Sequence, residues 1–460
     1  MMRKPRCETQ AEDKKINVLI LFDPHSLQTM FVQQHLGCFK RFSNHTIHYA
    51  AATLNNEFRF AIDRYDAVVI HFGVRLCVDG YLSNHCSEAL RSFRGPKILL
   101  IQDEYDLPFV AAQAMADLGI DVVFTTVPEE FRSIFYPPER VPGVTFRQCL
   151  TAYVPYERPA APSLPAIAER ATWIGYRGRK LPVWYGRLAA EKHEIGPHIM
   201  EACRRHGIPH DIRGDEDSRI NGAGWFDFLM RSRAVLGTES GANVVDCDGA
   251  IRAGVLAEQE RNPHIGETEL YETLVAQHDG RVRMNQISPK IFEAIALKTA
   301  LILFEGSYSG VLSKDHYIEL KKDYSNVDDV LKRVSDVAGL QAMVDRAYAD
   351  IVATGRYSYE VFVRDVEREI EQRVTPRAKP VLWTYAVIAA DDGAERWRSD
   401  TFHLPLTQPL PDMPPIVPVE VPVEPERRPL LKGPLRRAWL ALPEVVRRPM
   451  IRLARLVIDR

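Results

Sequence analysis

The chain has 460 residues, of which 46% are hydrophobic and 26% charged, and this is the composition of an ordinary globular protein. The length exceeds what one hydrophobic core usually organises, so we expect two domains. The formal net charge of −2 argues against a general nucleic-acid-binding surface, because neutralising phosphates requires a basic excess.

The cysteines and the N-terminal sequence favour a cytoplasmic protein. The seven cysteines are dispersed without a C-x-x-C pair, which favours reduced thiols over disulfides or a zinc site. Residues 1–15 are polar and lack the apolar core of a signal peptide. No run reaches the roughly 18 apolar residues that a membrane-spanning helix needs. We therefore expect a cytoplasmic chain, unless a membrane surface holds it.

Apolar strands alternate with helical stretches along the first third of the chain. Strands are predicted at residues 16–22, 67–71, 97–102 and 121–125, with a helix over 27–42. This rhythm is typical of parallel βαβ units in a doubly wound sheet. We assign residues 1–155 to an N-terminal Rossmann-like domain.

A proline-rich linker at residues 153–165 precedes a second alternation of the same kind. The predicted elements are strands at 172–176, 210–213, 234–237 and 300–304, a helix over 184–206, a charged helical insertion within 246–285, and closing helices at 328–348 and 358–373. We assign residues 168–375 to a second Rossmann-like domain. The predicted fold class is α/β, with two Rossmann-like domains facing a cleft.

The composition changes in the extension formed by residues 376–460. Residues 404–429 are dense in proline and predict an extended tether. Residues 427–460 hold ten Lys and Arg against two acidic residues, and from position 449 apolar and basic side chains fall on opposite helical faces. Such a helix suits an anionic membrane surface. The alternative is a helix that docks on the protein's own core or on a partner.

The most informative segment is residues 286–305. Ser288 is a plausible N-cap and Pro289 suits the first helical position. A helix N-terminus attracts phosphate, and Lys290 would add a full charge against a diphosphate. Glu293, one turn further in, could accept hydrogen bonds from ribose hydroxyls. The alternative is a capped core helix with two solvated charges.

The order S-x-K-x-F-E-A-x-A-x-x-x-A-x-I-L in this segment resembles the C-terminal domain of the glycosyl transferases group 1 family, which has the GT-B fold. By this resemblance Glu293 matches the second glutamate of the family's E-x7-E motif, which binds the donor ribose. The first glutamate, which touches the donor sugar, would fall at Asn285, so the chain departs from the pattern there. Ser288 likewise replaces a family glycine.

Basic residues follow the predicted strand at 172–176. The resemblance implies an Arg and a Lys after this strand that clasp the donor diphosphate, and either Arg177 with Lys180 or Arg187 with Lys192 could be that pair. Arg177 is favoured, because it lies at the carboxyl end of a strand, where doubly wound sheets bind ligands. The alternative for Arg187 and Lys192 is the solvated face of a helix.

Two further positions in the second half follow strand ends. Glu239, in a glycine-rich stretch after the strand at 234–237, is our candidate to replace the missing first glutamate. The alternative is a turn whose polar groups cap the next segment. Gly306, after the strand at 300–304, could approach the donor through its backbone N–H.

Acceptor-side candidates lie at strand ends of the first half. Asp103 and Glu104 are consecutive acids that could supply a general base for an inverting transferase. His25 and His71 also end strands, although a single histidine in such a place is more often structural.

The resulting hypothesis is a glycosyltransferase that moves a sugar from a nucleotide-sugar donor to a glycan, lipid-linked or protein acceptor. No D-x-D pair demands a metal, and GT-B enzymes generally need none, so we expect no metal and no cofactor beyond the co-substrate. We expect no nucleic-acid partner. Two alternatives stay open: a nucleotide-sugar epimerase, which also uses twin Rossmann domains, and a catalytically degenerate GT-B module that binds a glycan or partner at the membrane.

Overall fold

The computed structural model describes residues 15–52, 62–78 and 80–374. The predicted tether and basic terminal helix of residues 376–460 lie outside the described residues. None of the described helices is long and apolar enough to span a bilayer.

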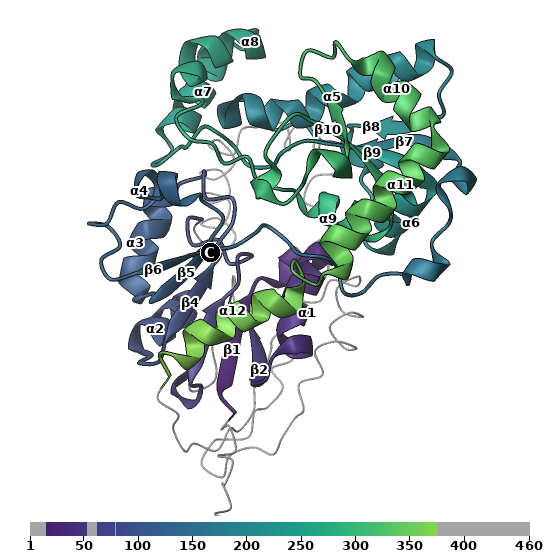
Figure 1. Ribbon diagram of the computed structural model, residues 1–460. Helices are drawn as coiled ribbons and strands as arrows, with labels where there is room; N and C mark the ends of the chain where they lie inside the picture. The colour runs from purple at the N-terminus through teal and green to yellow at the C-terminus, as the bar shows by residue number, and fades with distance from the viewer. Residues whose placement is uncertain (1–14, 53–61, 79, 375–460) are drawn as a thin grey trace, which may run out of the picture. The chain divides into compact units, whose positions relative to one another are not determined.

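The first half is a parallel sheet of six strands in the order β2-β1-β3-β4-β5-β6 (Figure 1). The strands are β1 Asn17–Phe22, β2 Thr46–Ala51, β3 Ala67–Ile70, β4 Lys97–Leu100, β5 Val122–Thr125 and β6 Thr145–Gln148. The helices are α1 Met30–Phe42, α2 Asn84–Ser92, α3 Pro108–Leu118 and α4 Arg132–Phe135. All four strands predicted here are confirmed. The prediction missed β2 and β6, because their polar residues interrupt the apolar runs that mark buried strands.

The second half is a separate parallel sheet in the order β11-β10-β9-β7-β8. Its strands are β7 Thr172–Arg177, β8 His210–Arg213, β9 Ser232–Gly237, β10 Ala300–Phe304 and β11 Ile318–Leu320. Its helices are α5 Gly186–Arg205, α6 Ala223–Arg231, α7 Ala250–Arg261, α8 Glu267–Leu270, α9 Pro289–Ala296, α10 Val327–Ser335 and α11 Val337–Ala347. The predicted α/β class with two Rossmann-like halves is confirmed.

One predicted helix is wrong in its continuity. Residues 328–348 form two helices, α10 and α11, that meet at Asp336. The Asp336 carboxylate accepts a hydrogen bond from the backbone N–H of Gly339 at 3.0 Å. This side chain therefore caps a new helix start, which competes with continuation of the first helix.

Both sheets reverse their strand order at one place. The reversal falls between β1 and β3 in the first sheet and between β7 and β9 in the second. In open parallel sheets, ligands bind outside the carboxyl ends of the strands at such a switch point. The topology alone therefore selects two places where a ligand site is expected.

The last described helix, α12 Tyr359–Glu371, packs on the first half, although the sequence division placed it in the second. Its buried residues Tyr359, Phe362 and Val366 share one core with α1 and β1, and Figure 1 shows α12 beside α1. The chain segment that leads into α12 runs beside the linker, where the N–H of Val154 donates to the carbonyl of Tyr357 at 2.8 Å. The chain therefore crosses to the second half along the linker and returns to the first half beside it, in the segment before α12.

Arg170 fastens the end of the linker to the second sheet. Its buried guanidinium donates to the carbonyl oxygens of Pro165, Ser232 and Leu297 and to the Thr299 hydroxyl, at 2.8 to 3.2 Å. Burial lowers the pKa of Arg170 to about 10. Hydrogen bonds to neutral acceptors compensate this burial and join four segments at one point.

Candidate functional site

A cavity of about 390 Å³ opens at the carboxyl ends of β7 and β9, the switch point of the second sheet. Its lining includes residues of β7 and the following turn, the loop at 218–222, Trp225, the start of α9, and Thr29, Met30 and Phe31 from the first half. The cavity is therefore shared by the two halves. Three predicted donor residues on α9, namely Ser288, Lys290 and Glu293, all line it.

The start of α9 has the form that its sequence predicts. Ser288 has extended backbone angles and Pro289 occupies the first helical turn. The Ser288 side chain makes no capping hydrogen bond, so the first-turn N–H groups are not capped by it. An uncapped helix N-terminus at a cavity wall favours an anion there.

Glu293 and Trp225 form a hydrogen-bonded pair in the cavity wall. The indole Nε1–H of Trp225 donates to Glu293 Oε2 at 2.7 Å. Burial raises the pKa of Glu293, and the bond from Trp225 and the charge of Lys290 oppose that rise. Trp225 fixes one carboxylate oxygen, which leaves Oε1 as the atom that can meet a ligand.

Lys290 lies beside this pair with a lowered basicity. Its Nζ donates to the backbone carbonyl of Arg177 at 2.8 Å and lies 5.2 Å from the centre of the Trp225 ring. The side chain is exposed to the cavity, yet protein surrounds the ammonium, and this burial lowers the pKa of Lys290 to about 8. The charges of Lys192, Arg179 and Arg219 lower it further, while Glu293 raises it.

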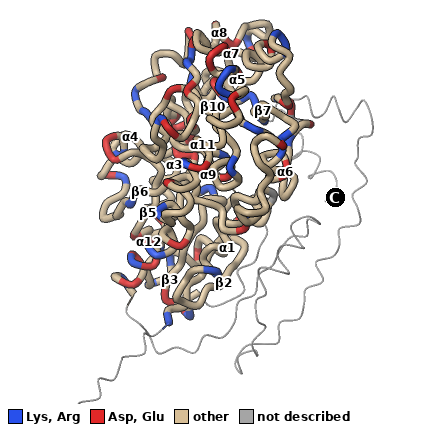
Figure 2. Tube along the Cα trace, turned by 45° about the vertical axis from the view of Figure 1, so that its right-hand side comes forward, with Lys and Arg blue, Asp and Glu red and all other residues tan. Residues whose placement is uncertain are grey.

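Lys192 reaches the cavity from α5. Its Nζ donates to the Ser240 hydroxyl at 3.1 Å, and burial lowers its pKa. Asp103 of the first half acts on Lys192 electrostatically and raises that pKa. Figure 2 shows Lys and Arg positions on α5 and next to β7 and α9. The cavity lining therefore holds more cations than carboxylates, the latter being Glu293 and Asp215, and this suits a polyanionic ligand.

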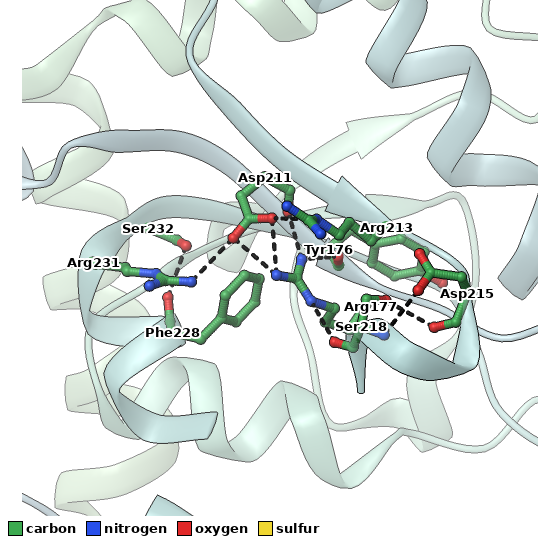
Figure 3. Close-up of polar contacts among 9 residues, drawn as sticks. All are labelled: Tyr176, Arg177, Asp211, Arg213, Asp215, Ser218, Phe228, Arg231 and Ser232. Carbon is green, nitrogen blue, oxygen red and sulfur yellow. Dashed lines mark hydrogen bonds and ion pairs between the residues drawn. The ribbon is translucent and has the colours of Figure 1, made fainter. Parts of the chain in front are cut away.

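Arg177 lines the same cavity but is committed to the protein (Figure 3). Its Nη2 makes a bidentate pair with Asp211 at 2.8 and 2.9 Å, its Nη1 donates to the carbonyls of Tyr176 and Asp211, and its Nε donates to the carbonyl of Ser218 at 3.0 Å. All five guanidinium donors are thus used. The expected clasp of a diphosphate by Arg177 has no donor left to make it.

The Arg177 network shapes the cavity wall. Through Ser218 it holds the loop after β8, where Asp215 accepts from the Ser218 N–H at 2.8 Å. Arg231 also donates to Asp211, at 3.0 Å (Figure 3). Burial alone would raise the pKa of Asp211, but its arginine partners lower it below the usual value. Asp211 therefore stays ionised and holds Arg177 in place.

Lys180 and Arg187 point to the insertion rather than to the cavity lining. Lys180 pairs with Glu267 of α8 at 2.6 Å. The Arg187 guanidinium lies 4.7 Å from the centre of the Tyr271 ring, and its backbone N–H donates to Asp279 at 2.8 Å. Of the four predicted phosphate ligands after β7, Arg177 and Lys192 line the cavity, and of these two only Lys192 acts electrostatically on Lys290.

Glu239 is buried and holds the 306–308 turn through hydrogen bonds. Its Oε1 accepts from the N–H groups of Ser307 and Tyr308, both at 2.8 Å, and its Oε2 accepts from the Asn285 side chain. Gly306 lies against it, since a Cβ there would come 2.6 Å from the Glu239 carboxyl carbon. Glu239 contacts Asn285, which stands where the family has its first glutamate. The Glu239 carboxylate, however, is occupied by the 306–308 turn. Neither Glu239 nor Gly306 lines the cavity.

The two acids after β4 differ sharply. Glu104 is buried and accepts from Thr126 N, Thr126 Oγ1 and Tyr136 Oη at 2.9 Å each, and also from Thr125. Burial raises the pKa of Glu104 to about 7. This carboxyl group ties β4 to β5 and does not face solvent. Asp103 is exposed, with a φ of 54° and one hydrogen bond from the Tyr105 hydroxyl at 2.9 Å.

His71 is likewise enclosed. Its Nε2 lies 3.1 Å from His35 Nδ1, and the N–H of Gly73 donates to its Nδ1 at 3.1 Å. Burial lowers the pKa of both histidines, that of His35 to about 3. The pair is neutral core, which excludes His71 from an acceptor rim.

Sequence reasoning missed three cavity residues, Arg179, Arg219 and Trp225. Arg179 stands in the run GYRGRK, two places after the arginine that was favoured. Arg219 and Trp225 follow β8, whose carboxyl end borders the same sheet edge. Arg177 was favoured because ligands bind at the carboxyl ends of strands, and the same reasoning applies to this loop after β8. Within the described ranges, no group of three His, Cys, Asp or Glu residues could hold a metal ion.

No protein-family model matches the chain, and no curated protein matches it. Among solved structures, it is similar to an α-glucosyltransferase in complex with UDP (TM-score 0.46, 10% identity, 78% of this chain and 100% of that one). It is also similar to the Anabaena protein HepE in complex with UDP-glucose (TM-score 0.42, 8% identity, 78% and 100%) and to an α1,3-fucosyltransferase (TM-score 0.39, 10% identity, 82% and 96%). These likenesses concern the fold and carry no activity over to this chain.

The wall of the cavity should depend on Arg177. Replacement by Met leaves Asp211 and the Ser218 carbonyl without their main donor, so we expect Arg177→Met to lower the free energy of unfolding by about 3 kcal/mol. The matched control is Arg213→Met, because Arg213 is exposed and lies 3.6 Å from the same carboxylate; its effect should stay within about 0.5 kcal/mol. Urea denaturation measures both, and equal effects of the two substitutions would contradict the assignment.

Proposed function

We propose that the chain is a glycosyltransferase that binds a nucleotide-sugar donor in the cavity at the ends of β7 and β9. The observation that carries this proposal is the crowding of Lys192, Lys290, Arg179 and Arg219 around one buried carboxylate at an uncapped helix start. A nucleoside diphosphate has the matching chemistry: an anionic diphosphate for the cations and ribose hydroxyls for the carboxylate.

The groups divide between the parts of the donor. Lys290 and Lys192 would meet the diphosphate, and the N–H groups at the start of α9 would add partial positive charge. Glu293 Oε1 would accept from a ribose hydroxyl, while Trp225 holds the other oxygen and so fixes the direction of the carboxylate. When the bond from sugar to diphosphate breaks, negative charge grows on the leaving phosphate. Preplaced lysines stabilise that charge.

The acceptor would approach from the first half, because Thr29, Met30 and Phe31 close the cavity on that side. We propose a glycan, lipid-linked or protein acceptor. The ten basic residues of segment 427–460 support work at an anionic membrane surface on the cytoplasmic side.

One observation favours a second candidate, a module that binds the donor without turnover. The position of the sugar-contacting glutamate is Asn285, and the neighbouring Glu239 is occupied by the 306–308 turn. A binding module would hold nucleotide and nucleotide sugar alike and release no nucleotide over time. Chromatography of the nucleotide sugar after incubation separates the two candidates.

Removal of the Lys290 ammonium should weaken donor binding. A charged hydrogen bond is worth about 1.5–3 kcal/mol, so we expect Lys290→Ala to raise the Kd for the preferred nucleoside diphosphate roughly ten-fold or more. Titration calorimetry with UDP and GDP measures this. Lys180→Ala is the matched control, since Lys180 pairs with Glu267 outside the cavity lining, and it should bind like wild type. A larger effect of Lys180→Ala would move the site to the insertion.

Binding should also weaken as pH rises through about 8, where Lys290 loses its proton in the free protein. An anion prefers the protonated lysine, so affinity is highest below the pKa of Lys290 and falls by up to about ten-fold per pH unit above it. The measurement is Kd for the same nucleotide between pH 7.5 and 9.5, where the phosphate charge is constant. Lys290→Ala should give the flatter profile, and an equally steep profile in that variant would contradict the attribution.

A further inference from the structure

The carboxyl end of β1 carries an aspartate and a histidine that are hydrogen-bonded to each other. Asp23 ends the strand, and His25 follows in the short 3-10 helix Pro24–Gln28. His25 Nδ1 lies 3.1 Å from Asp23 Oδ1, which also accepts from the His25 backbone N–H at 3.1 Å. The Asp23 side chain is 7% exposed and that of His25 is 62% exposed.

The loop that carries this dyad is held firmly. The Ser26 hydroxyl donates to the Asp23 carbonyl at 2.7 Å, and the Ser26 N–H donates to the same oxygen at 3.2 Å. Gly73, after β3, lies so close that a Cβ on it would come 2.9 Å from Ser26 Oγ. The loop is therefore fixed against the end of β3, and His25 is presented in a defined direction.

A buried carboxylate that holds the Nδ1–H of an exposed histidine leaves Nε2 as a proton acceptor facing outward. This arrangement is the one that orients a histidine for general-base catalysis. His71 lacks such a free nitrogen, because both of its ring nitrogens face protein groups.

The place of the dyad fits the acceptor. Asp23 and His25 stand at the switch point between β1 and β3, the ligand position of the first sheet. The same segment runs on into Thr29, Met30 and Phe31, which line the donor cavity of the second half. The lining begins at Thr29, four residues after His25, so a base here would act on an acceptor held between the dyad and the donor.

On the basis of the proposed function, we propose that His25 is the catalytic base, that Asp23 is its positioning residue, and that transfer inverts the anomeric configuration. His25 Nε2 takes the proton of the acceptor hydroxyl as the oxygen forms its bond to the anomeric carbon. The bond from that carbon to the diphosphate breaks in the same step, and its electron pair goes to the phosphate oxygen. The imidazolium then returns its proton to solvent.

The experiment uses the full chain, UDP-glucose, UDP-N-acetylglucosamine and GDP-mannose as donors, and water as the acceptor. Calorimetry gives donor Kd, and nucleotide release gives the turnover rate. We expect His25→Gln to lower turnover about 100-fold or more with donor Kd unchanged, as for loss of a general base. Asp23→Asn should lower turnover without changing donor Kd. Proton NMR of the released sugar should show the anomer opposite to that of the donor.

His206→Gln is the matched control, because His206 pairs with Asp328 at 3.2 Å on the exposed surface and should turn over like wild type. Full turnover in His25→Gln would overturn the proposal, as would a released sugar with the anomeric configuration of the donor. Turnover lost in Asp103→Asn but kept in His25→Gln would assign the base to Asp103. A wild-type chain that binds a donor without turnover would overturn the base and leave the donor site standing. A chain that binds none of the donors would overturn the donor site itself.

Discussion

The second half of the molecule depends on how Arg177 is satisfied. Its guanidinium joins β7, β8 and the loop after β8, and its carbonyl receives the Lys290 ammonium. The bidentate pair with Asp211 neutralises the positive charge of Arg177 within the protein. An arginine in a cavity wall thus acts as a scaffold, and the neighbouring lysines keep their charge for a ligand. These bonds hold the cavity wall and the Lys290 side chain, while the buried apolar residues of α9 hold the helix itself.

Charge explains why the cavity is suited to an anion. Burial lowers the pKa of Lys290 to about 8, and repulsion from the neighbouring cations contributes to the lowering. The fold imposes this arrangement through covalent connection and packing, and a bound diphosphate would relieve it. The first half contributes a group of opposite character, the Asp23–His25 dyad, at its own switch point. Two sheets of like topology would therefore hold the leaving group and the proton acceptor separately.

The sequence predicted the parts that depend on local pattern. The strand patterns located eight of the eleven strands in the described residues, all but β2, β6 and β11. Ser288 and Pro289 located the start of α9, with Lys290 and Glu293 on the cavity. Hydrogen-bond partners come from distant parts of the chain, so the sequence did not show which candidate site residues are already occupied by other protein groups. Glu104, Glu239 and Arg177 stand at strand ends as expected, yet distant residues saturate them. Asp23 was visible beside His25, but only the backbone turn shows that the two side chains meet.

A crystal structure of the full chain with a bound nucleoside diphosphate would show whether the cavity at the ends of β7 and β9 is the donor site. We expect a diphosphate within hydrogen-bonding distance of the Lys290 ammonium and a ribose hydroxyl on Glu293. Trp225 should keep its bond to Glu293, and Arg177 should keep its pair with Asp211. A diphosphate bound instead by Lys180 and Arg187, or an Arg177 that leaves Asp211 to clasp the phosphate, would contradict this expectation.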